Sequence, residues 1–143
     1  MALPQPFTRV REFEKMGFGM FLHWGLYSQL GAGEWAQASQ SIPFCEYKKL
    51  ADTFTAEEFD ADAIAALAAK TGMKYIVLTT RHHDGFSLYD TCGLNEFDAL
   101  HTPAKRDLIA EFAETCLICP CIEASEVSRN PESPSSVYCK AHY

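Results

Sequence analysis

Three polar clusters contain the side chains that could carry chemistry. His23 ends one predicted strand, Glu34 and Trp35 lie in the loop that follows it, and His82 and His83 end a second predicted strand. In a parallel α/β fold, ligands bind at the carboxyl ends of the strands and in the loops that follow them. We therefore expect the three clusters to belong to one site.

The residue types in these clusters suit a ligand that combines hydroxyl groups with an apolar face. An imidazole ring has two nitrogens that donate or accept a hydrogen bond, so it can match a hydroxyl group either way. Trp35 offers a flat apolar face beside the carboxylate of Glu34, and a sugar ring presents both C–H groups and hydroxyl groups. The clusters favour sugar recognition, with ordinary packing as the alternative for His23 and Trp35.

A metal site is the weaker interpretation of His82 and His83. Adjacent strand residues point to opposite faces of a sheet, so the two rings cannot easily bind one ion. Such a site would need His23 or Asp84 as a further ligand. Hydrogen bonding to a polar ligand is the preferred role, and a purely structural role for the pair stays open.

Cysteine spacing leaves a zinc ribbon as another alternative. Cys116, Cys119, Cys139 and His142 have the ligand spacing of such a site. Against it, Cys116 belongs to the apolar face of a predicted helix, and the residues between the two pairs have little strand character. The sequence contains no P-loop, dinucleotide fingerprint or nucleophile elbow, so nucleotide and α/β-hydrolase chemistry lack sequence support.

Two strands joined by a helix are predicted to position the clusters. Residues 18–24 and 74–80 are apolar runs of strand length, and the first suits a strand buried on both faces. Between them, a capping box at Thr55 and Glu58 opens an amphipathic helix that ends at Gly72. A helix between two buried strands indicates a βαβ unit and therefore a parallel sheet.

Long loops and one more helix surround this unit. Residues 25–51 are predicted to be a loop with a short helix near 46–52, and residues 81–105 form a second loop. A helix then opens at Asp107, and the residues of its apolar face are Leu108, Ile109, Phe112, Ala113 and Cys116. We interpret Arg106-Asp107 as a helix-start or ion-pair feature, and Tyr47 and Phe86 as core aromatics.

Composition describes a globular chain with an acidic middle. The 143 residues are 48% hydrophobic and 22% charged, with a net charge of −7, and residues 51–116 hold twelve acidic and five basic residues. Such a charge repels phosphate backbones and anionic lipid headgroups, so we expect no nucleic-acid and no membrane partner. Charged residues interrupt the first 15 positions, which predicts a cytoplasmic chain, or a secreted, lysosomal or periplasmic one that has lost its leader.

Several motifs resemble the start of glycoside hydrolase family 29, the α-L-fucosidases. They occur in one order from about residue 15 to residue 116, and they are FGMFLHWGLYS (18–28), GEW (33–35), PFCEY (43–47), AEEFD (56–60), YIVLTTRHHDGF (75–86) and TPAKRD (102–107). The resemblance implies an α/β fold, namely a partial (β/α)8 TIM barrel with the first two βα units only. It also implies a retaining glycosidase that releases terminal α-L-fucose from glycans.

The resemblance assigns roles to the three clusters. His23, Glu34, Trp35, His82 and His83 match family residues that bind the substrate, so the expected partner is a fucosylated glycan or fucoside, with no cofactor and no metal. Homo-oligomers are a possibility that it implies for the full-length family member. No residue here matches the family's nucleophile or acid/base, so we assign no catalytic residue and expect this chain alone to be inactive.

The family pattern stops after Cys116. We divide the chain into residues 1–116, the N-terminal portion of the catalytic barrel, and residues 117–143, an irregular tail outside the family. The tail contains five Ser, three Pro and three of the six Cys, and it has neither Gly nor Phe. The alternatives are a non-catalytic module that binds fucose or a partner, and a zinc-ribbon tail.

Overall fold

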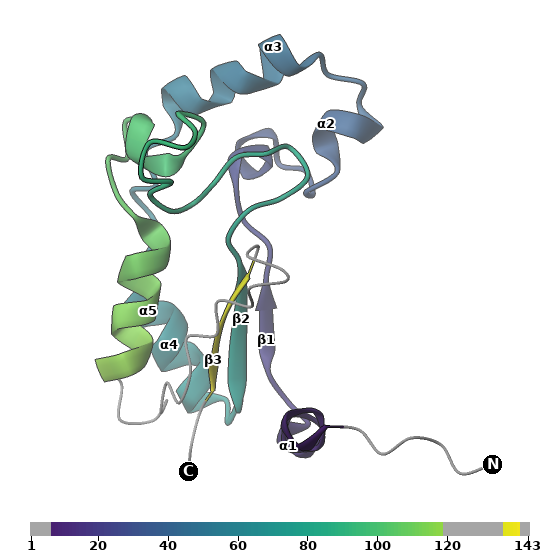
Figure 1. Cartoon of the computed structure of the whole chain (residues 1–143), viewed down its shortest axis with the longest axis vertical. Coiled ribbons are helices and arrows are strands. Elements are labelled where there is room, and N and C mark those ends of the chain that lie inside the picture. The colour runs from purple at the N-terminus through teal and green to yellow at the C-terminus, as the bar shows by residue number, and fades with distance from the viewer. Residues whose placement is uncertain (1–6, 119–135, 141–143) are drawn as a thin grey trace, which may run out of the picture.

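A computed structural model describes residues 7–118 and 136–140 of the chain. Within them a three-stranded sheet has two longer helices beside it and short helical segments beyond one end (Figure 1). None of the described helices is long and apolar enough to cross a membrane. In chain order the elements are α1 (Thr8–Met16), β1 (Met20–Leu22), the 3-10 helix η1 (Leu26–Leu30), α2 (Ala36–Ser39), α3 (Phe44–Tyr47), the 3-10 helix η2 (Lys48–Thr53), α4 (Ala61–Lys70), β2 (Tyr75–Thr79), the 3-10 helix η3 (Ala99–His101), α5 (Leu108–Ile118) and β3 (Ser136–Lys140).

The predicted parallel pair of strands is confirmed. β1 pairs with β2 in parallel, from Met20 opposite Ile76 to Leu22 opposite Leu78. Helix α4 connects the two strands, as the βαβ interpretation requires. The carboxyl ends of both strands therefore lie at the same end of the sheet, where η1, α2 and α3 lie (Figure 1).

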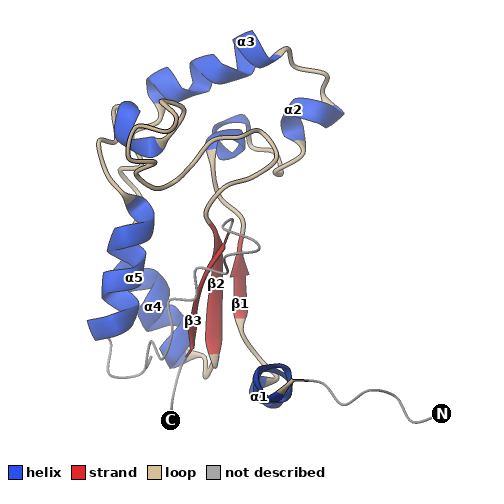
Figure 2. Ribbon diagram, viewed as in Figure 1, coloured by secondary structure: helices blue, strands red, loops and turns tan. Residues whose placement is uncertain are grey.

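The core lies between the sheet and the two longer helices, which run side by side (Figure 2). Residues of β2 alternate between buried and half-buried positions, and Ile76 and Leu78 are buried in one cluster with Ala65 of α4 and Phe112 of α5. The expectation that β1 is buried on both faces is wrong, since Phe21 is 59% exposed. Met20 and Leu22 on the other face are half-buried and pack against the core, so β1 is buried on one face only.

The predicted start of α4 is also wrong. The helix begins at Ala61, and its cap is Asp60, whose Oδ1 accepts a hydrogen bond from the backbone N–H of Ala63 at 2.8 Å. A helix from Thr55 is not possible because Ala56 has a φ of +52°, in the left-handed region. The end of the helix agrees with the prediction, since Gly72 follows it with a positive φ.

The two long connections contain short helical segments. The predicted helix near 46–52 is confirmed as η2, while η1, α2 and α3 were expected to be loop. In the second connection only η3 is helical among the described residues, and Ser87 forms isolated bridges with Arg81 and Asp98. Helix α5 confirms its prediction, and its Leu108, Phe112 and Cys116 are fully buried.

Five residues of the tail join the sheet. Ser136–Lys140 form β3, which pairs antiparallel to β2 and gives the strand order β1-β2-β3. The prediction of an irregular tail is therefore wrong for these residues, while 119–135 and 141–143 lie outside the described residues. The second edge of β2 has backbone N–H and C=O groups that need partners, and a segment with Val137 and Tyr138 has suitable β propensity.

Gly19, just before β1, lies directly under the ring of Tyr75. A Cβ atom at Gly19 would lie 2.5 Å from three carbon atoms of that ring. The ring also contacts Phe13 of α1 at a centroid distance of 4.8 Å, so it cannot move without disturbing α1. We expect Gly19→Ala to lower the free energy of unfolding by about 1–3 kcal/mol, measured by urea titration. Gly33→Ala is the control, because a Cβ there meets nothing within 4 Å, and equal losses in both variants would contradict the proposed clash.

Candidate functional site

The histidines that follow β1 and β2 lie against each other. His23 comes directly after β1, and His82 is the third residue after β2. His23 Nδ1 and His82 Nε2 are 3.1 Å apart, and the ring centroids are separated by 5.2 Å. The parallel pairing of the strands brings these residues, which are 59 positions apart in the sequence, to one place.

A buried tyrosine completes the contacts of His82. The hydroxyl group of Tyr27, in η1, lies 3.1 Å from the same Nε2 atom, and the two rings meet edge to face at 5.0 Å. Burial raises the pKa of Tyr27, and the charges of Glu34 and Asp84 raise it further, so the hydroxyl keeps its proton. The sequence interpretation missed Tyr27, because a tyrosine among apolar residues indicates core packing.

The surroundings of His82 favour its neutral form. Burial lowers the pKa of this imidazole, with smaller contributions in the same direction from His23 and His83. The carboxylates of Asp84 and Glu34 oppose this shift without reversing it. A neutral imidazole has one nitrogen that donates and one that accepts. Since Nε2 already contacts His23 and Tyr27, the tautomer that these contacts select decides whether Nδ1 donates or accepts.

His83 and Trp35 form a flat surface beside this pair. Their rings are stacked, with centroids 4.2 Å apart and planes 24° from parallel. Trp35 is 54% exposed, so packing in the core does not explain it. The structure therefore brings together two clusters that the sequence placed in different loops.

Glu34 affects this site through its charge. It precedes Trp35 in the loop before α2 and is half-buried. Its carboxylate raises the pKa of both Tyr27 and His82, which places its charge within electrostatic reach of them. All five residues predicted to bind substrate thus lie at or near the carboxyl edge of the β1–β2 pair.

Asp84 is buried beneath the histidines and both of its oxygens are occupied. The hydroxyl group of Tyr47 donates to Oδ2 at 2.6 Å, and the backbone N–H of Phe86 donates to Oδ1 at 2.9 Å. Tyr47 and Phe86 are buried core aromatics, as predicted. The sequence interpretation did not foresee that the Tyr47 hydroxyl group also contacts the histidine turn.

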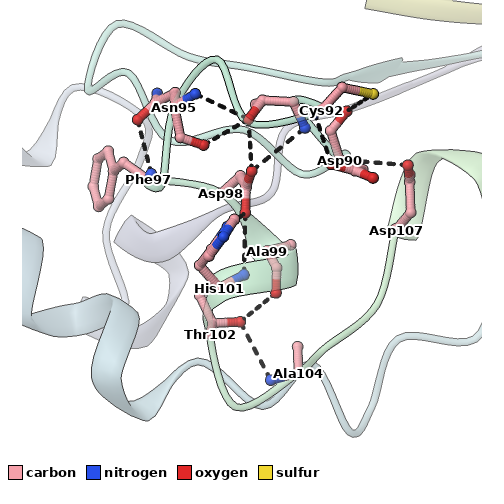
Figure 3. A network of polar contacts seen from close by, with 11 residues as sticks. Asp90, Cys92, Asn95, Phe97, Asp98, Ala99, His101, Thr102, Ala104 and Asp107 are labelled. Atoms are coloured by element: carbon pink, nitrogen blue, oxygen red, sulfur yellow. Dashed lines mark hydrogen bonds and ion pairs between the residues drawn. The ribbon is translucent and has the colours of Figure 1, made fainter.

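A buried carboxylate organises the loop between β2 and α5. Asp98 accepts hydrogen bonds from the hydroxyl group of Thr91 at 2.8 Å and from the backbone N–H of His101 at 3.1 Å, and His101 Nδ1 lies 2.7 Å from it (Figure 3). Burial alone would raise the pKa of Asp98, but the hydrogen bonds from His101 and Thr91 hold it below its usual value. The loop is therefore built around a charged group.

The start of α5 confirms the prediction for Arg106 and Asp107. Asp107 Oδ1 accepts from the backbone N–H of Ala110 at 2.8 Å. Its Oδ2 accepts from the backbone N–H of Asp90 at 3.0 Å, which joins the helix to the loop (Figure 3). Arg106 forms an ion pair with Glu111. Its guanidinium group also donates to the carbonyl group of Ala56 at 2.9 Å.

An open groove of about 700 Å³ lies on one side of His23. Its walls come from the end of β1, from η1, from residues 53–60 and from α4, and Trp24 lies among them. Trp24 stacks on Phe59 with centroids 5.1 Å apart. The groove therefore adjoins the histidine cluster, while Trp35 and His83 lie outside its lining.

The described residues contain no group of three or more His, Cys, Asp or Glu side chains arranged to hold a metal ion. Of the four zinc-ribbon residues, Cys116 is fully buried in the core, and Cys119 and His142 lie outside the described residues. Cys139 lies in β3.

Comparison with known proteins gives a consistent result for this chain. A family model described as Alpha-L-fucosidase matches residues 8–117. The plasma alpha-L-fucosidase of Rattus norvegicus is 31% identical over 116 residues, which cover 70% of this chain and 25% of that protein. The chain thus spans about a quarter of the length of the curated relatives it matches.

Solved structures give the same match. An alpha-L-fucosidase isoenzyme from Paenibacillus thiaminolyticus aligns with a TM-score of 0.71 and 44% identity over 76% of this chain and 25% of that one. An alpha-L-fucosidase from Lactobacillus casei, solved with its alpha-L-fucose product, aligns with a TM-score of 0.69 and 42% identity over 76% of this chain and 37% of that one.

Proposed function

This chain belongs to the α-L-fucosidase family, and from that premise we propose that residues 1–116 are the N-terminal portion of a (β/α)8 catalytic barrel that releases terminal α-L-fucose from glycans. The parallel strands β1 and β2, with α4 between them and α5 after them, support two successive βα units. Barrel enzymes bind substrate at the carboxyl ends of their strands, where the histidines of this chain meet.

The contact of His23 with His82, beside the stacked rings of Trp35 and His83, carries the proposal. We assign the sugar hydroxyl groups to His23, His82, His83 and the carboxylate of Glu34. The exposed indole of Trp35 is the surface on which the C–H face or methyl group of fucose would stack. We propose these five as binding residues, because their imidazole, carboxylate and indole groups suit the hydroxyl groups and the apolar face of a sugar.

The carboxylates at this edge do not make a retaining hydrolase by themselves. Retention requires a nucleophile and an acid/base whose carboxyl groups are about 5 Å apart on either side of the anomeric carbon. Asp84 is buried and hydrogen-bonded through both oxygens, so it is not free to attack a sugar. Glu34 alone cannot fill both roles, and we infer that at least one of the two catalytic carboxylates comes from outside residues 1–116.

We expect the 143-residue chain to bind L-fucose weakly without hydrolysing fucosides. Titration calorimetry should give millimolar affinity for L-fucose and no binding of D-fucose, whose hydroxyl groups have the mirror-image arrangement. His82→Ala and Trp35→Ala should each weaken binding at least tenfold, which is about 1.4 kcal/mol. The same preparation should release no phenol from an aryl α-L-fucoside.

Three results would contradict this proposal. Equal affinity for L-fucose and D-fucose, or an L-fucose affinity that His82→Ala does not change, would refute the proposed sugar site. Turnover of the aryl fucoside that disappears in Glu34→Gln would mean that a carboxylate of this chain does catalyse the reaction. Glu57→Gln, an exposed carboxylate on the rim of the neighbouring groove, is the control for the loss of one negative charge.

A second candidate is a non-catalytic fucose-binding module, and one observation favours it for this chain. In a (β/α)8 barrel every strand is parallel to its neighbours. Here the second edge of β2 is paired antiparallel with β3, at the place where a third parallel strand would lie. The two candidates differ in the aryl fucoside assay, once the chain is mixed with the remaining part of a family barrel: only a barrel portion would recover turnover.

A further inference from the structure

We propose that Tyr47 is a positioning residue for the His82–His83 pair, acting through its hydrogen bond to Asp84. The proposal rests on the sugar-binding function given above and extends it to the layer of residues beneath the site. Tyr47 comes from α3, a segment that contains none of the five proposed binding residues. Its hydroxyl group donates to Asp84 Oδ2 at 2.6 Å, and both groups are buried.

Asp84 uses its two oxygens to fix the turn in two directions. Oδ2 accepts from Tyr47, which anchors the turn to α3, while Oδ1 accepts from the backbone N–H of Phe86 two residues later. The backbone N–H of Gly85 donates to the carbonyl group of His82 at 3.1 Å, and Gly85 has a φ of +83° that suits glycine. The turn that follows the two histidines is therefore held by hydrogen bonds within itself and by one hydrogen bond to Tyr47 of α3.

Each histidine has its own support above this anchor. His82 meets His23 and Tyr27 at its Nε2 atom, and the ring of His83 rests on Trp35. These contacts fix ring rotation only if the backbone of the turn stays in place. Loss of the hydrogen bond from Tyr47 to Asp84 would let the backbone of the turn move, and the imidazole rings would move with it.

The hydroxyl group of Tyr47 is needed for the hydrogen bond to Asp84 and not for packing in the core. The side chain is 1% exposed, and a phenylalanine would fill almost the same volume without reaching Asp84 by a hydrogen bond. Burial, the hydrogen bond to Asp84 and the charge of that carboxylate all raise the pKa of Tyr47, so the hydroxyl group remains a donor. Without it, a buried carboxylate oxygen loses its partner.

The test is Tyr47→Phe in the full 143-residue chain, with two readouts. L-fucose affinity measured by calorimetry should fall about tenfold, while far-UV circular dichroism stays unchanged. In the free protein, the imidazole signals of His82 and His83 in 15N–1H NMR spectra should shift and broaden. Tyr89→Phe, which removes the hydroxyl group of a half-buried tyrosine, should leave both readouts unchanged.

Asp84→Asn decides between positioning and simple stabilisation. Its amide oxygen can accept from the backbone N–H of Phe86 while its NH2 group donates to the Tyr47 oxygen, so Asp84→Asn should preserve much of the affinity. The double variant Tyr47→Phe/Asp84→Asn should bind no more weakly than Tyr47→Phe alone if the Tyr47–Asp84 contact accounts for both losses. Unchanged imidazole signals in Tyr47→Phe would overturn the proposal, whether or not the chain binds fucose. Failure of the unaltered chain to bind L-fucose, with shifted imidazole signals in the variant, would instead refute the sugar site and leave the positioning role standing. If Tyr47→Phe does not fold, Asp84→Leu is measured by the same two readouts, with the same outcomes expected.

Discussion

Replacement of Asp98 by alanine lowers the free energy of unfolding by about 3–4 kcal/mol, a large part of the stability of a small domain. Asp98 is fully buried and accepts hydrogen bonds from side-chain and backbone donors of Thr91 and His101. Alanine removes the shared carboxylate that ties these donors together, although the Thr91 hydroxyl group keeps the carbonyl group of Asn95 at 2.6 Å and the His101 backbone N–H keeps that of residue 98 at 3.3 Å. Urea titration followed by circular dichroism measures the loss, and Asp52→Ala, an exposed carboxylate, should cost less than about 0.5 kcal/mol.

The pH dependence of this effect has a defined sign. Hydrogen bonds from His101 and Thr91 outweigh burial and hold the pKa of Asp98 below its ordinary value. The contribution of the charged form is therefore complete at pH values above the unfolded pKa, near 3.8, and is lost as the pH falls through the folded pKa. The difference in unfolding free energy between the unaltered chain and Asp98→Asn should be largest near pH 7 and should shrink below about pH 4. A constant difference across that range would contradict a charged Asp98.

The elements with a clear hydrophobic period were predictable. The apolar run that became β2 and the helical spacing of α5 both agree with the structure, because each buries one face against the core. The parallel pairing followed from the order strand, helix, strand. The start of α4 was not predictable from the capping box at Thr55, because the guanidinium group of Arg106, 50 residues further along, donates to the carbonyl group of Ala56.

The polar residues of the site could be predicted from the sequence, but the tyrosines that contact them could not. His23, Trp35 and His83 stand out in sequence because such side chains are unusual in or beside an apolar strand. Tyr27 and Tyr47 do not stand out, since a tyrosine in an apolar context indicates core packing. Only the three-dimensional structure shows that their hydroxyl groups meet His82 and Asp84.

The antiparallel strand β3 is a feature of this chain that its family membership does not predict. The family model ends at residue 117, and Ser136–Lys140 pair with β2 beyond that limit. An exposed sheet edge accepts any segment with suitable β propensity, whichever direction it runs. Membership of the family therefore describes β1, α4, β2 and α5, while the partner of the second edge of β2 is set by the residues after the family match.

A row of aromatic rings packs the loops around the site, and its central residue should contribute strongly to stability. Phe86 lies at its centre and is buried, with its ring edge-on to those of Phe54 at 5.3 Å and Phe97 at 5.2 Å. The row continues through further ring contacts from Phe59, just before α4, to α3, and its members in order are Phe59, Trp24, Phe54, Phe86, Phe97 and Phe44. It packs the loops that hold the histidines onto the rest of the core.

Phe86→Ala should lower the free energy of unfolding by about 3–5 kcal/mol, because it opens a cavity and removes two edge-to-face contacts. Phe86→Leu keeps most of the apolar volume and should cost less than half as much. Phe44 ends the same row but is 52% exposed, so Phe44→Ala should cost below about 1 kcal/mol. Urea titration of the three variants measures this order. Equal losses for Phe86→Ala and Phe44→Ala would mean that the row is not a packed unit, and that the loops around the histidines are held by their hydrogen bonds alone.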